Sequence, residues 1–160
     1  MEDMYVLHVM SGEELSIAEA LRDMDYNAIV PEEECIVRRA GEHMRVMTVL
    51  MPGYVFLSVP RMDEATYYDA CGITGVIRML NYGTPMCQDD VDTVYRLAGL
   101  KSALMVKRHE DGSYTILDGP FAGQESYLVK VDKRQHRAIL RVSLCGRPVD
   151  IQVSAVLIAE

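Results

Sequence analysis

The sequence predicts an α+β protein in two parts: an α/β sandwich of helices on a largely antiparallel sheet, followed by a small β-barrel. Apolar strand-forming runs alternate with three short helical patterns up to residue 98, and the helical period disappears from residue 113 onward. The charge changes at the same place, because residues 1–112 hold 10 Lys/Arg and 19 Asp/Glu whereas residues 113–160 hold 6 and 5. This change indicates two units with different partners.

The first part opens with a strand and a helix. Residues 5–10 form a short apolar run typical of a buried strand, and apolar residues recur at helical spacing through residues 13–25. Glu13, Glu14 and Glu19 lie in the first turns of this helix, where the helix dipole favours negative charge. Two further strands, residues 28–30 and 34–39, lead to a predicted hairpin tip at residues 40–42, from which residues 44–50 return.

The rest of the first part repeats this alternation. Residues 51–59 predict a turn and an apolar strand, and residues 63–71 predict a helix that ends at Gly72 because glycine accepts the left-handed conformation. A strand at residues 76–80 and a helix at residues 88–97 complete a domain of residues 3–98. Residues 99–112 lack a convincing core pattern and predict a linker, within which residues 104–106 have the composition of a short strand.

The second part, residues 113–160, is rich in short strands. The predicted strands are residues 114–117, 126–132, 138–144 and 149–153. In the third, Leu140, Val142 and Leu144 alternate with Arg141 and Ser143, the pattern of a strand buried on one face. Closely spaced short strands within about fifty residues are typical of a small barrel, which leaves few free edges.

Composition excludes several classes of protein. No stretch approaches the ~18–20 apolar residues needed to cross a bilayer, and no secretion signal is evident, so we expect a cytoplasmic protein with no membrane partner. The cysteines form no CxxC pair and have no histidine at a ligand spacing, so we expect no metal site and no cofactor. No sequence pattern sets a base beside a thiol, which argues against an enzyme with a cysteine nucleophile. A Cys/His hydrolase built on Cys71 or Cys145 is a remote alternative.

Four segments, in order and spacing, resemble the NusG family. The segment Tyr5-Val6-Leu7, followed by Ser11-Gly12, is similar to the family's opening strand and helix, with Met4 in place of the usual tryptophan. The block Met51-Pro52-Gly53-Tyr54-Val55-Phe56 resembles Phe-Pro-Gly-Tyr-Val/Leu-Phe/Val. The KOW motif is matched by Asp118-Gly119-Pro120-Phe121-Ala122-Gly123, and the family's Phe-Gly-Arg turn by Cys145-Gly146-Arg147-Pro148. Together these segments span nearly the whole chain.

The resemblance implies an NGN domain over residues 3–98, a linker over residues 99–112 and a KOW β-barrel over residues 113–160. In the family, the NGN domain docks on the coiled-coil clamp helices of the largest RNA polymerase subunit and promotes processive elongation and antitermination. This activity is allosteric, not enzymatic. The polymerase-binding residues that the resemblance implies are His8, Met51, Pro52, Tyr54, Phe56, Thr66 and Tyr67.

Some of these residues have a plainer interpretation when they are considered alone. Phe56 is favoured as a core residue, whereas the hydroxyl of Tyr54 favours a wet edge or a partner. His8 alone would be a hydrogen-bonded structural histidine. For Thr66 and the pair Tyr67-Tyr68, a helix with one ring packed inward and one solvated explains the pattern equally well.

The second part carries the densest positive cluster of this acidic chain, opposed locally only by Asp132. A cluster of this kind is typical of phosphate binding, so we expect it to bind RNA, with an ordinary charged surface as the alternative. Its members are Lys130, Lys133, Arg134, His136, Arg137 and Arg141. A smaller group flanks the first hairpin tip and either follows the backbone of upstream DNA or is simply solvated: Arg38, Arg39, His43 and Arg45.

Two departures from the family pattern narrow the expected function. Cys145 replaces the aromatic residue that, in the general elongation factor, helps the KOW barrel bind ribosomal protein S10, so coupling to the ribosome is doubtful. The first helix is acidic and would repel a DNA strand. The chain therefore most resembles the specialised LoaP class, which is recruited by a structured leader RNA. The alternatives are a housekeeping NusG elongation factor and, more remotely, a ribosome-associated KOW RNA-binding protein.

Overall fold

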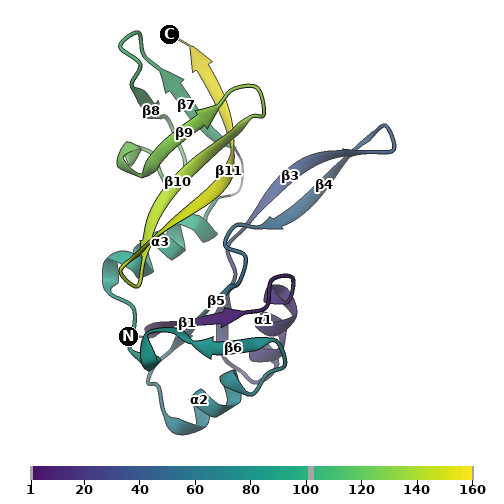
Figure 1. Ribbon diagram of the computed structural model, residues 1–160, viewed down its shortest axis with the longest axis vertical. Helices are drawn as coiled ribbons and strands as arrows, with labels where there is room; N and C mark the ends of the chain where they lie inside the picture. The colour runs from purple at the N-terminus through teal and green to yellow at the C-terminus, as the bar shows by residue number, and fades with distance from the viewer. Residues whose placement is uncertain (1, 101–102, 160) are drawn as a thin grey trace. The chain divides into compact units, whose positions relative to one another are not determined.

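The computed structural model describes residues 2–100 and 103–159, which divide into two compact units (Figure 1). The first unit contains Met1–Val30 and Met51–Asp92, and the second contains Pro31–Leu50 and Thr93–Glu160. The boundary falls within helix α3 (Gln88–Ala98). The segment Pro31–Leu50 therefore groups with the C-terminal residues, whereas the sequence placed it in the N-terminal domain.

A four-stranded antiparallel sheet forms the first unit. Its strand order is β2-β5-β1-β6, with β1 (Asp3–Val9), β2 (Asn27–Ile29), β5 (Tyr54–Val59) and β6 (Val76–Met79). Both faces of its central strands are buried: Val6 and Phe56 lie opposite each other on one face, and Tyr5 and Leu57 on the other. The predicted strands and their antiparallel arrangement are confirmed for this unit.

Two helices flank this sheet. Helix α1 (Glu14–Asp23) contacts β2 and β5 and buries Ile17, Ala18 and Leu21, which recur at helical spacing along one face. Helix α2 (Glu64–Cys71) contacts β6, and its N-terminus is capped by Asp63, whose Oδ1 accepts the backbone N–H of Thr66 at 2.7 Å. Between β6 and α3 lies a short 3₁₀ turn, η1 (Leu80–Gly83).

Gly72 ends α2, but for a different reason from the one expected. Its backbone is right-handed, with φ of −83°, so no left-handed conformation is required. A Cβ added at this position would instead lie 2.8 Å from the carbonyl oxygen of Tyr68. Glycine is therefore needed here for the close approach of two backbone segments.

The second unit contains a hairpin and a five-stranded sheet. The hairpin pairs β3 (Glu32–Arg39) with β4 (Glu42–Val49) and turns at the predicted tip. The sheet has the order β8-β7-β11-β10-β9, from β7 (Leu104–Arg108), β8 (Tyr114–Ile116), β9 (Leu128–Asp132), β10 (Arg137–Leu144) and β11 (Arg147–Ala159). Only the β7–β11 pair among these neighbours is parallel.

The expected linker differs from the structure. Leu104–Arg108 forms β7, which pairs with both β8 and β11, so most of the segment 99–112 belongs to the sheet or to its β7–β8 turn; residues 101–102 lie outside the described residues. The alternation predicted for β10 is present, because Leu140, Val142 and Leu144 are buried. Phe121 is fully buried, with its ring edge-to-face against Tyr127 from the 3₁₀ turn η2 (Glu125–Tyr127).

Candidate functional site

A row of partly accessible side chains lies at one end of the first sheet, on one of its faces. His8 on β1 lies opposite Tyr54 on β5, with ring centroids 6.0 Å apart and an interplanar angle of 29°. On the other side of β1, His8 pairs with Arg78 of β6, which is exposed. Side chains directly opposite one another in a sheet share a face, so Tyr54, His8 and Arg78 form a continuous row. The next pair on this face, Val6 and Phe56, is buried.

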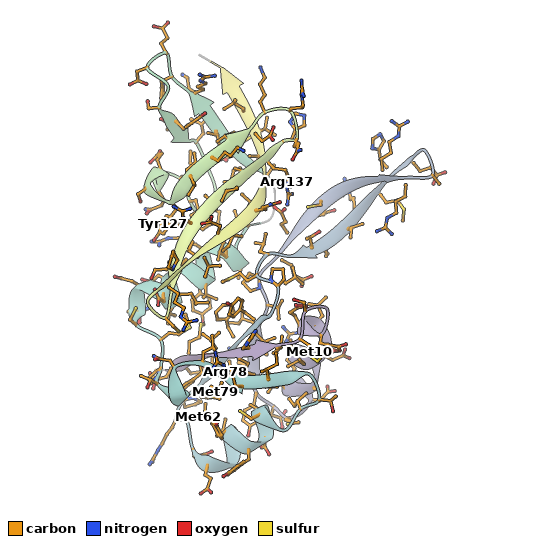
Figure 2. All side chains as sticks on the ribbon, in the orientation of Figure 1. Met10, Met62, Arg78, Met79, Tyr127 and Arg137 are labelled. Carbon is orange, nitrogen blue, oxygen red and sulfur yellow. The ribbon has the colours of Figure 1, made fainter. Side chains whose placement is uncertain are left out.

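Two exposed residues adjoin this row along the chain. Met10, which follows β1, is 58% exposed (Figure 2). Pro52, two residues before Tyr54, is exposed between buried Met51 and Gly53. We refer to His8, Met10, Pro52, Tyr54 and Arg78 together as the Tyr54 surface. The sequence did not single out Met10 or Arg78. For Met10, the only sequence feature that could have indicated an exposed position was its place directly before Ser11-Gly12.

The turn before Tyr54 is held by a buried carboxylate. Glu14 is only 3% exposed; its Oε1 accepts the backbone N–H of Gly12 at 2.8 Å, and its Oε2 accepts that of Gly53 at 3.0 Å. Val9 closes the arrangement by donating its N–H to the carbonyl of Gly53 at 2.8 Å. The first strand, the first helix and the turn before Tyr54 are therefore joined at one point. The sequence assigned Glu14 only a helix-dipole role and missed this contact.

The other residues implied for polymerase binding divide into core and surface. Phe56, Met51 and Thr66 are 0%, 2% and 7% exposed, so their side chains support the unit from within and offer no contact area. Tyr67 is accessible and packs edge-to-face against Tyr68, with ring centroids 5.7 Å apart. Both tyrosines are exposed, so the interpretation in which one ring packs inward does not describe this helix.

The cationic cluster of the second unit lies around the β9–β10 turn. Residues 133–136 form this turn, in which His136 has a positive φ of 55° and Asp132 Oδ1 accepts the backbone N–H of Gln135 at 3.1 Å. Four of the six predicted cations are exposed and, within residues 2–100 and 103–159, make no side-chain ion pair: Lys130, Lys133, Arg134 and His136. We call these four residues the turn cluster.

The remaining two cations are already paired. Arg137 Nη1 donates to Glu33 Oε1 at 2.9 Å and to Ser154 Oγ at 3.0 Å, and Glu33 is only 2% exposed. Arg141 makes a two-pronged contact with Asp150, at 2.7 and 3.1 Å. This exposed pair raises the pKa of Arg141 and lowers that of Asp150, chiefly through the hydrogen bonds between them. Of the six predicted basic residues, those without an ion partner in the described part of the chain are therefore the members of the turn cluster.

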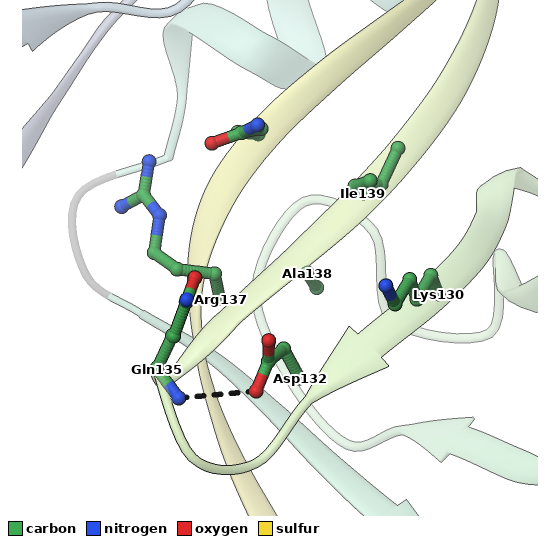
Figure 3. A pocket seen from close by; sticks show the side chains of 7 residues that line it. Lys130, Asp132, Gln135, Arg137, Ala138 and Ile139 are labelled. Atoms are coloured by element: carbon green, nitrogen blue, oxygen red, sulfur yellow. Dashed lines mark hydrogen bonds between the residues drawn. The ribbon is translucent and has the colours of Figure 1, made fainter.

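A small open pocket of about 130 Å³ lies beside the turn cluster (Figure 3). Polar side chains dominate its lining. The residues that line it are Lys130, Asp132, Gln135, Arg137, Ala138, Ile139 and Gln152. The sequence did not predict this pocket, because its members come from three strands and the turn.

Two further sequence predictions concern hairpins in the second unit. Arg38, Arg39 and His43 are exposed near the β3–β4 tip, while Arg45 lies 3.5 Å from Glu34 in an exposed ion pair. Cys145 stands in the two-residue β10–β11 turn with φ of 51°, and it is followed by Gly146 with φ of 79°. Two successive positive φ values define the tight hairpin turn that suits the twist of paired strands.

A family model described as "Transcription termination factor nusG" matches residues 2–94, more than half of the chain. This chain belongs to the NusG family. Curated NusG-family relatives named "Transcription termination/antitermination protein NusG" include one from Xylella fastidiosa, 27% identical with 96% of each chain covered. Another, from Bacillus subtilis, is 24% identical and covers 95% of this chain and 96% of that relative.

A solved NusG structure shares the fold. The structure described as "Domain interaction in Thermotoga maritima NusG" covers 98% of this chain and 94% of its own, with a TM-score of 0.60 and 19% identity. NusG-family proteins are transcription factors that act with RNA polymerase. Over the part of the chain that the structure describes, no group of three or more His, Cys, Asp or Glu side chains is arranged to hold a metal ion. No helix in that same part is long and apolar enough to span a membrane.

Proposed function

We propose that this NusG-family chain is a specialised, LoaP-like antitermination factor that binds the polymerase clamp helices through its first unit and a structured leader RNA through its second. In this proposal the five-stranded sheet of the second unit is a KOW barrel. The chain acts without catalytic residues, by holding the polymerase in a processive state. The leader RNA determines where it is recruited.

The observation that carries the RNA part is the placement of unpaired positive charge. Although the chain has a net charge of −8 with histidine counted as neutral, Lys130, Lys133 and Arg134 of the turn cluster are exposed within five residues, and exposed His136 follows two residues later. Phosphates bind such clusters through counterion release, and RNA helices present phosphates and 2′-hydroxyls because their major groove is too narrow for side chains. The protruding turn between β9 and β10 suits this kind of contact.

The polymerase part rests on the Tyr54 surface. The ring of Tyr54 stacks on His8 and is half-buried, while the Glu14 carboxylate fixes the turn before it. A tyrosine anchor with little remaining freedom loses little conformational entropy on binding, and tyrosine is over-represented among residues that dominate interfaces. A coiled coil with an apolar stripe would find at this surface two rings, Met10 and Pro52.

A general NusG elongation factor is the second candidate. The curated relatives from Xylella fastidiosa and Bacillus subtilis, named "Transcription termination/antitermination protein NusG", match nearly the full length of this chain. The two candidates differ in RNA specificity, because a general factor acts on any transcript and a recruited factor needs its leader.

The proposal is tested by crossing two variants with two ligands. The ligands are the isolated clamp helices of the polymerase and hairpin RNAs from the leader of the operon beside the gene. A Lys133→Ala/Arg134→Ala variant should lose RNA binding and keep clamp binding, and its log–log salt slope should flatten by ~0.7–0.9 for each phosphate that the variant no longer binds. Tyr54→Ala should weaken clamp binding by ~1 kcal/mol or more and leave RNA binding intact.

Tyr95→Ala is a matched control for the clamp experiment, because this tyrosine is 50% exposed on α3. RNA binding that survives the Lys133→Ala/Arg134→Ala substitution would contradict the proposed LoaP-like role in binding leader RNA. Clamp affinity that is unchanged in Tyr54→Ala, together with a lowered melting temperature, would show that Tyr54 serves the core.

A further inference from the structure

The pocket beside the turn cluster is built by three adjacent strands. Ile139 on β10 lies directly opposite Lys130 of β9 on one side and Gln152 of β11 on the other. These three side chains form one row on the outer face of the sheet. At the end of the row nearer the turn, the pocket is bounded by Asp132 and Gln135. Gln135 also belongs to the turn that carries Lys133 and Arg134, so the pocket and the phosphate-binding cations adjoin.

The size and chemistry of the pocket indicate its ligand. Its volume of about 130 Å³ is well below the ~300–1,000 Å³ of sites for drug-sized molecules and cofactors, so it suits one small planar ring. The Ile139 side chain offers an apolar surface for the face of a ring, whereas the Ala138 side chain is buried on the opposite face of the sheet. Around Ile139, the Lys130 ammonium donates hydrogen bonds, the Asp132 carboxylate accepts them, and the amides of Gln135 and Gln152 do both.

The rim of the pocket is held in place before any ligand binds. The guanidinium of Arg137 is fixed by Glu33 and Ser154, and in Figure 3 its side chain extends away from Ile139 and Lys130. Asp132 accepts the N–H of Gln135 through Oδ1. A carboxylate has about four acceptor positions, so Asp132 keeps acceptor capacity for a ligand.

We infer that this pocket binds one unpaired guanine base of the RNA, an inference that rests on the proposed RNA-binding function. Guanine presents a carbonyl acceptor, O6, which matches the Lys130 ammonium. Next to O6 it presents two donors, N1–H and the N2 amino group, which match the Asp132 carboxylate. Adenine lacks the carbonyl, and uracil and cytosine lack the neighbouring pair of donors. Proteins read RNA sequence through such unstacked bases in loops and bulges, and Lys133 and Arg134 hold the flanking phosphates.

The test uses the full chain and short single-stranded RNAs. Fluorescence anisotropy would compare hexauridylate with the same hexamer carrying one central guanosine, adenosine or inosine. The guanosine hexamer should bind at least about fivefold more tightly than hexauridylate, as expected when two hydrogen bonds discriminate between bases. Inosine lacks the N2 amino group and should fall between them, while adenosine should give no gain.

Two variants with the same change in charge separate base reading from electrostatics. Asp132→Asn keeps an acceptor for Gln135 N–H but loses the carboxylate, so the guanosine preference should disappear while hexauridylate binding is retained or strengthened. Asp150→Asn removes an equal charge from the same sheet. Asp150 does not line the pocket and pairs instead with Arg141. This control should keep the full guanosine preference.

The outcomes distinguish this inference from the function on which it rests. Equal affinity for all hexamers, with binding that falls steeply with salt and depends on Lys133 and Arg134, would overturn the guanine pocket and leave the RNA-binding role intact. A preference that disappears equally in Asp150→Asn would overturn it too, since the preference would then follow charge. Absence of binding to every hexamer and to the leader hairpins would overturn both.

Discussion

The guanidinium of Arg137 donates a 2.9 Å hydrogen bond to the carboxylate of Glu33, a residue 104 positions earlier in the chain. Ser154 completes the contact by donating its backbone N–H to the other Glu33 oxygen at 2.9 Å. A carboxylate that is 98% buried is costly unless it is paired and hydrogen-bonded, so this arginine serves the fold of the second unit. Counting basic residues in the sequence does not reveal that use.

Substitution of Arg137 should therefore act on stability. Arg137→Ala leaves Glu33 with a buried charge and no cation, and we expect the free energy of unfolding to fall by about 2 kcal/mol or more. Urea denaturation followed by circular dichroism measures this loss. Arg141→Ala is the matched control, because its partner Asp150 is exposed and the pair should contribute little. Equal stability of the two variants would contradict the structural role of Arg137.

Substitution of Glu14 should loosen the turn before Tyr54. Glu14→Ala leaves the N–H groups of Gly12 and Gly53 without their acceptor, and the free energy of unfolding should drop by ~1–3 kcal/mol. Affinity for the clamp helices should fall as well, because the anchor loses its fixed position. Glu13→Ala, which removes an exposed carboxylate one residue earlier, serves as the control. Normal clamp binding by a destabilised Glu14→Ala variant would separate folding from positioning and refute the second effect.

Ribosome coupling makes a separate prediction. Cys145 lies in the β10–β11 turn, at the position for which the resemblance to the general factor implies an aromatic ring, so the full chain should bind ribosomal protein S10 poorly. An NMR titration of labelled protein with S10 would measure this. A tight complex that shifts the signals of Cys145 and its neighbours would return the general elongation factor to first place.

The cap of α2 should make stability depend on pH. The N–H of Thr66 donates to Asp63 and lowers the pKa of that carboxyl, so the unfolded chain binds a proton more readily than the folded one. The contribution of the cap is complete above the ordinary aspartate pKa and is lost as the pH falls through the lowered folded value. Asn caps helices without titrating, so Asp63→Asn should show a smaller loss of unfolding free energy below about pH 4. Identical pH profiles for variant and wild type would contradict this account.

The strands and helices were predictable because their signals are local. The apolar runs of β1 and β5, the helical spacing in α1 and the alternation in β10 each need only a few neighbouring residues to be recognised. Strand β7 was harder to predict from the sequence, since residues 104–108 include two cations. The strand forms by pairing with β11, about fifty residues later in the chain.

The candidate sites were predictable only in part. The sequence singled out the basic residues of the turn cluster and the segment of Tyr54, but the resemblance also implied contact roles for Met51 and Thr66, whose side chains are buried. The burial of Phe56 agrees with the core role favoured for it from the sequence. The partners of Arg137 and Glu14 lie far away in sequence or on the backbone, where no side-chain pattern marks them. Charge and the family resemblance therefore predicted where the candidate regions lie in the sequence, and three-dimensional pairing decided which of their residues remain accessible.

The parallel pairing of β7 with the end of β11 bears on how the protein is made. The first sheet is complete in sequence at Met79, whereas Leu104 finds its sheet partner only when Ala155 has been synthesised. Because chains leave the ribosome from the N-terminus and domains fold as units, the Tyr54 surface should form while the five-stranded sheet still lacks its fifth strand. Under the proposed function, a nascent chain would thus acquire its polymerase-binding surface first, and its capacity to select a transcript only near the end of synthesis.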